Sequence, residues 1–68
     1  MGNVYKKIEI VGTAADSVTK AVEDGLARAA KTVQHVDWFE VTEIRGRVGD
    51  GGSVEEYQVG MKVGFRLK

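Results

Sequence analysis

The sequence predicts an α+β fold in the order β-α-β-β, a three-stranded antiparallel sheet with one helix packed on one face. Three observations predict it. Residues 3–12 and 57–67 alternate apolar and polar side chains with a period of two, which is typical of half-buried strands. Residues 13–33 instead repeat apolar side chains every three or four positions, as an amphipathic helix does. A glycine-rich segment at 49–53 joins two strand-like runs and indicates a hairpin.

The first strand is predicted over residues 3–12, where Ile8 and Ile10 lie on one face and Lys7 and Glu9 on the other. A helix crosses over between this strand and the hairpin. The strand therefore pairs either beside the third strand or between the two long strands. With so short a chain, we expect one domain over residues 1–68.

The helix is predicted from an apolar stripe within residues 13–33. Thr13 is the expected N-cap, and Asp16 three residues later resembles a capping box. Gly25 lies on the stripe, where glycine costs about 1 kcal/mol relative to alanine. Close approach of the helix to the sheet would explain that glycine. The stripe consists of Val18, Ala21, Val22, Gly25, Leu26, Ala29 and Val33.

The second strand, residues 35–48, carries the only tryptophan of the chain next to a phenylalanine. Neighbouring side chains of a strand point to opposite faces. Phe39 is predicted on the helix-covered face and Trp38 on the open face. The alternation then slips by one residue near Glu43, which a β-bulge, a twist out of the sheet or a strand end would explain.

The open face predicts a site around Trp38. The third strand contributes Gln58 to this face together with Gly60 and Gly64, and we expect the indole to lie near this amide. Glycine within a strand often marks close approach by a ligand or another backbone. Three interpretations of Trp38 remain at this point: an anchor of a subunit interface, a stacking platform for a flat ligand, or a surface residue without a role.

The composition excludes several kinds of site. The chain has no cysteine and one histidine, His35, so disulfides, thiolate metal sites and multi-histidine metal sites within one chain are excluded. A chain of 68 residues is marginally stable alone, so oligomerisation is the expected way to stabilise it, although some domains of this size fold alone. Because no poised nucleophile, acid or base is evident, the protein is not expected to be an enzyme.

The charge balance argues against two classes of partner. Ten basic and ten acidic residues cancel, so no general attraction to nucleic acid or to a membrane surface is expected. No signal-peptide pattern is seen, and the expected location is the cytoplasm. An alternative function is nucleic-acid binding, in which Trp38 would stack on bases beside a basic strip on the hairpin. That strip would consist of Arg45, Arg47, Lys62 and Arg66.

Four stretches together resemble the dodecin family of small flavin-binding proteins. They are "VYKKIEIVGTA", "ARAAKTVQHV", "DWFEVTEIRG" and "EYQVGMKVGFRL", and they cover most of the chain. The resemblance implies a hollow homododecamer with flavins bound in pairs between subunits. It implies that such proteins store or buffer flavin and suppress its photochemistry. The expected ligand is FMN, or another flavin such as riboflavin or FAD, and some members also bind coenzyme A.

The resemblance also implies roles for individual residues. Trp38 would stack on the isoalloxazine ring, Gln58 would hydrogen-bond its polar edge, and Arg45 would contact the FMN phosphate. In archaeal members an acidic residue five positions after the tryptophan takes part in magnesium binding. That position is Glu43 here, a glutamate in place of aspartate, and it leaves a metal role undecided. The rival interpretation is a scaffold or a coenzyme A-binding module without a flavin role.

Overall fold

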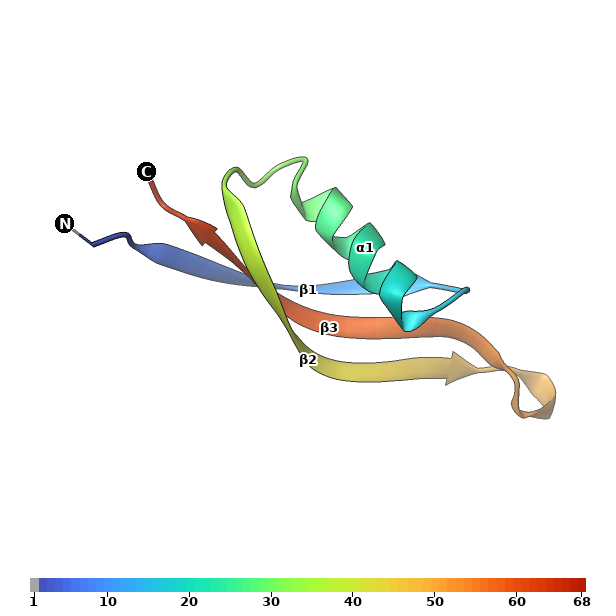
Figure 1. The fold of residues 1–68 in the computed structure, drawn as a ribbon. Helices are drawn as coiled ribbons and strands as arrows, with labels where there is room; N and C mark the ends of the chain where they lie inside the picture. Colours follow the sequence, from blue (N-terminus) through green and yellow to red (C-terminus); the bar gives the residue numbers. More distant parts are fainter. Residues whose placement is uncertain (1) are drawn as a thin grey trace.

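A computed structural model of the chain, which describes residues 2–68, has the predicted β-α-β-β order (Figure 1). The sheet is three-stranded and antiparallel, and a single α-helix packs on one of its faces. Among the described residues, no helix is long and apolar enough to cross a membrane. The elements are β1 (Tyr5–Ala14), α1 (Val18–Ala29), β2 (Val36–Val48), the 3-10 turn η1 (Asp50–Gly52) and β3 (Val54–Arg66).

The third strand is the centre of the sheet. The strand order is β1-β3-β2, so of the two predicted arrangements β1 takes the place beside β3. Met61 of β3 lies opposite Ile10 on one side and Val41 on the other. Because β3 has a neighbouring strand on each side, the helix-facing side chains at its centre are surrounded by others. Val59, Met61 and Val63 are fully buried there.

The helix begins later than the sequence predicted. Its N-cap is Ser17, in an extended conformation, whose hydroxyl oxygen accepts a 3.0 Å hydrogen bond from the Lys20 backbone N–H. The prediction of Thr13 as the cap is wrong, because Thr13 is still paired with Gln58 in the sheet. Ladder pairing with β3 keeps the backbone of this segment extended past Gly12, where the first strand was expected to end.

Two glycines allow the helix to lie close to the sheet. A Cβ atom on Gly12 would overlap the backbone carbonyl oxygen of Ala21 in α1. A Cβ atom on Gly25 would lie 3.3 Å from the Gly12 Cα and 3.0 Å from the Met61 Cε. The prediction that Gly25 marks close helix–sheet approach is therefore confirmed, and Ala21 is fully buried as a result.

The helix covers only part of its face of the sheet. It packs on β1 and β3, while β2 lies to the side (Figure 1). A helix is about 10–12 Å wide, enough for two strands spaced about 4.8 Å apart but not for three. Phe39 and Ile44 of β2 lie opposite Val63 and Val59, but their side chains are 44% and 60% exposed. Phe39 thus points to the helix side, as predicted, without being covered there.

Candidate functional site

Trp38 lies on the face of the sheet that α1 does not cover. It is paired with Gly64, which alternates with the buried Val63. A Cβ atom on Gly64 would overlap the six-membered ring of the indole, so the ring lies directly on the backbone of β3. The side chain is 37% exposed. One face of the indole therefore rests on the sheet while part of the ring remains accessible.

Tyr5 of β1 is a second aromatic residue of this site. Its ring centroid lies 5.0 Å from that of Trp38, and the two ring planes are tilted by 58°. Tilted aromatic pairs at this distance are favourable and restrict both rings. Tyr5 was not among the site residues predicted from the sequence. Its alternation with Ile8 and Ile10 placed it on the open face, but its nearness to Trp38 depends on the pairing of β1 with β3.

An ion pair crosses the central strand beside the aromatic pair. The Lys7 Nζ of β1 donates a 2.8 Å hydrogen bond to the Glu40 Oε1 of β2, and both side chains are half exposed. The hydrogen bond from Lys7, and secondly its charge, hold the pKa of the Glu40 carboxyl below its ordinary value, with a smaller contribution from Lys62. This contact joins the two edge strands over β3.

The slip in the second strand is a β-bulge. The register shifts between Val41 and Glu43, so that Thr42 is the additional residue of β2. After the bulge, Ile44 lies opposite Val59 on the helix side and Arg45 lies opposite Gln58 on the open side. Of the three explanations offered by the sequence, the bulge is the one observed. It places Arg45 on the same face as Trp38.

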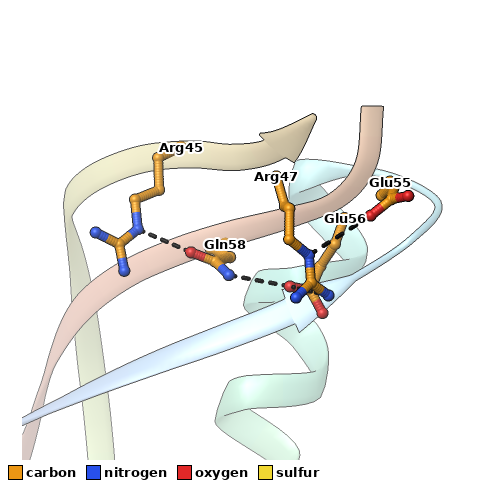
Figure 2. Close-up of polar contacts among 5 residues, drawn as sticks. All are labelled: Arg45, Arg47, Glu55, Glu56 and Gln58. Carbon is orange, nitrogen blue, oxygen red and sulfur yellow. Dashed lines mark hydrogen bonds and ion pairs between the residues drawn. The ribbon is translucent and has the colours of Figure 1, made fainter. Parts of the chain in front are cut away.

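Gln58 lies within a chain of polar contacts at the hairpin end of the open face (Figure 2). Its Oε1 accepts a 2.8 Å hydrogen bond from the Arg45 Nε, and its Nε2 donates a 3.0 Å hydrogen bond to the Glu56 Oε1. The same Glu56 oxygen lies 3.4 Å from a terminal nitrogen of Arg47. The structure therefore brings together Gln58 and Arg45, two of the three predicted site residues.

Trp38 is separated from this polar chain. It lies opposite Gly64, whereas Arg45 lies opposite Gln58, six positions earlier on β3. At about 3.3 Å per residue, the separation is about 20 Å along the strand, longer than three fused six-membered rings. The expectation that the indole lies near the Gln58 amide is therefore wrong within one chain. A single flat ligand can contact both residues only if they come from different chains.

The remaining predicted residues lie apart from these contacts. Glu43 is on the open face, where a Cβ atom on Gly60 would lie 3.0 Å from its Cγ. Among residues 2–68 there is no group of three or more acidic or histidine side chains suited to a metal ion. His35 is exposed just before β2 and has a positive φ of 64°. Its carbonyl oxygen accepts a hydrogen bond from the Arg66 backbone N–H at 3.1 Å.

The family model for dodecin matches residues 4–68, nearly the whole length of the chain. The chain belongs to the dodecin family. The curated dodecin of Thermus thermophilus is 57% identical over 68 residues, which is 100% of this chain and 97% of that protein. The resemblance noted in the sequence is therefore confirmed.

Solved structures agree with the family assignment of this dodecin. A crystal structure of a Thermus thermophilus protein is 57% identical, covers 98% of this chain and 97% of its own, and superimposes with a TM-score of 0.93. The dodecin of Streptomyces davaonensis is 44% identical over 100% of this chain and 98% of its own, with a TM-score of 0.94. The β-α-β-β fold is thus shared along the whole chain.

Proposed function

We propose that this dodecin binds flavin, with FMN as its main ligand, and stores it in a form protected from light. The flavins stack in pairs on Trp38 between subunits of a hollow homododecamer. The observation that carries this proposal is the accessible indole of Trp38, which rests on the backbone of Gly64 away from the hydrophobic core. A platform of this kind suits a flat aromatic ligand, because stacked rings attract one another and exclude water.

The polar residues of the site fit the rest of an FMN molecule. In its contacts with Arg45 and Glu56, the Gln58 amide uses one acceptor position and one donor position. One lone pair on Oε1 and one proton on Nε2 remain. Adjacent N–H and C=O groups, such as those at the edge of isoalloxazine, match this pair. The two terminal nitrogens of Arg45 are available for a phosphate, which guanidinium binds well.

Two features of the single chain support assembly from copies of itself. Trp38 and Gln58 lie too far apart to hold one ring within a chain, so a site that uses both needs a second subunit. Beside α1, an exposed apolar strip on β2 is formed by the side chains of Phe39, Val41 and Ile44. A small domain gains stability by covering such a strip with another subunit.

The chain's residues act by binding and shielding rather than by catalysis. A bound flavin supplies the light absorption and the redox reactivity, and the Trp38 indole in contact with it supplies an electron-rich ring that quenches the excited state. Tyr5 holds the indole at a fixed tilt, and Arg45 and Gln58 fix the polar end of the ligand. The balanced charge of the chain argues against nucleic acid and membranes as partners. The proposed location is the cytoplasm.

The test is a fluorescence titration of FMN with the protein, with the mass of the particle measured in the same buffer. We expect stoichiometric quenching on a particle of about twelve chains. Trp38→Ala should keep the particle and weaken FMN binding by at least about tenfold, because it removes the stacking surface. An unchanged titration in this variant would contradict the site. Binding of coenzyme A without quenching of FMN would favour a coenzyme A module, and assembly without any flavin binding would favour a scaffold.

A further inference from the structure

We propose that Glu56 is a positioning residue that fixes the orientation of the Gln58 amide and thereby sets which hydrogen-bonding pattern a bound ring must have. The inference rests on the proposed flavin site and deepens it. Glu56 itself is not expected to contact the ligand. It acts through Gln58, two residues later on the same face of β3.

The two neighbours of the Gln58 amide leave it one orientation. Arg45 only donates hydrogen bonds, so its Nε requires the amide oxygen, at 2.8 Å. The Glu56 carboxylate only accepts, so its Oε1 requires the amide nitrogen, at 3.0 Å. Turning the amide by 180° would place the oxygen against the carboxylate and the NH2 group against the guanidinium. Both contacts would become repulsive, and the amide is therefore held in one of its two orientations.

Glu56 is itself held in place, as Figure 2 shows. Its Oε1 lies 3.4 Å from a terminal nitrogen of Arg47, the residue opposite it on β2. Its side chain is only 26% exposed, whereas that of the neighbouring Glu55 is 55% exposed. Glu55 also approaches Arg47, at 3.7 Å, but the contacts of Gln58 are with Arg45 and Glu56. The two adjacent glutamates thus differ in their contacts: Glu56 accepts a hydrogen bond from the Gln58 amide, whereas Glu55 approaches Arg47.

The fixed amide favours one kind of ligand edge. With the oxygen held toward Arg45 and the nitrogen toward Glu56, the remaining lone pair and proton have a set order along the sheet. A ring whose N–H lies beside a carbonyl in the matching order forms two hydrogen bonds. A ring that lacks the N–H leaves the amide oxygen without one of these hydrogen bonds, which costs affinity. Glu56 therefore contributes to selectivity for an intact isoalloxazine edge.

The experiment compares Glu56→Gln with the matched control Glu55→Gln, which removes the same charge one residue away. Each variant and the wild type are titrated with FMN and with FMN methylated at the ring N3, which lacks the N–H. We expect Glu56→Gln to bind FMN about tenfold more weakly, the effect of losing a hydrogen bond to a charged group. The N3-methyl ligand should bind wild type and Glu56→Gln equally. Glu55→Gln should resemble wild type with both ligands.

A double-mutant cycle with Gln58→Ala gives a second reading. If Glu56 acts through the amide, Glu56→Gln should have little further effect once Gln58 is alanine. Equal FMN binding by Glu56→Gln and Glu55→Gln would overturn the inference and leave the flavin site standing. So would an equal loss for both ligands, or loss of the assembled particle in Glu56→Gln, because Glu56 would then be a structural residue. A wild-type protein that binds no FMN would instead overturn the proposed function itself.

Discussion

The side chains of β3 alternate between two faces of the sheet, and these two faces differ in what they contact. On the helix side, Val59, Met61 and Val63 are fully buried and form the centre of the core. On the open side, Gln58 carries polar contacts and Gly64 supports the indole of Trp38. The helix side is complete within one chain wherever α1 covers it, whereas on the open side the two halves of the proposed site do not meet. Stability and binding can therefore be altered separately on one strand.

Glycines show the contrast most sharply. Gly12 makes room for a backbone, because the atom nearest to its missing Cβ is the carbonyl oxygen of Ala21. Gly64 makes room for a side chain, the ring of Trp38. Backbone of a packed helix cannot move without loosening the whole core, whereas a side chain can rotate. Equal substitutions on the two faces should therefore have unequal costs in stability.

The largest effect is expected on the helix side. Gly12→Ala should lower the free energy of unfolding by about 1–3 kcal/mol, because the added methyl group pushes α1 away from the sheet. Denaturant unfolding checks this at fixed protein concentration. Val11→Ala is the matched control, since Val11 is the preceding residue and its side chain is exposed. A smaller loss for Gly12→Ala than for Val11→Ala would show that close helix–sheet packing at Gly12 does not limit stability.

On the open side, we expect a smaller loss of stability than on the helix side, together with weaker FMN binding. Gly64→Ala should displace the Trp38 indole and weaken FMN binding about tenfold, while costing less stability than Gly12→Ala. FMN titration and denaturant unfolding of the same preparation check both statements. Gly60→Ala is the control, because its methyl group would meet the flexible side chain of Glu43. Unchanged FMN affinity in Gly64→Ala would show that the indole is not the platform.

The smallest effect is expected from the Lys7–Glu40 pair. Lys7 lowers the pKa of Glu40 below 4.5 in the folded chain, so folding favours the charged carboxylate. The contribution is therefore present above that ordinary value and is lost as the pH falls through the lowered pKa. Glu40→Gln should be slightly less stable than wild type at neutral pH, and the difference should vanish in acid. Glu9→Gln, also opposite Lys62, serves as the control. A difference that persists unchanged in acid would contradict the assignment.

The sequence predicted the order of elements and the faces of their side chains well, because both depend on local periodicity. Trp38 and Phe39 lie on the faces that alternation indicated. The exposure of Phe39 was missed, since it depends on how many strands a helix can cover. The separation of Trp38 from Gln58 was also missed, because it follows from the pairing register. The position of the helix N-cap at Ser17 depended on how far β1 stays paired with β3, which no local pattern shows.

We propose that one flavin is held by Trp38 of one chain and Gln58 of another, and complementation between variant chains tests this arrangement. Trp38→Ala and Gln58→Ala chains are unfolded together in equal amounts, refolded into mixed particles and titrated with FMN. If the two residues come from different chains, roughly a quarter of the sites regain both side chains by random assembly. We expect this fraction of tight, quenching sites. A mixture that titrates only as the average of the two separate variants would contradict it.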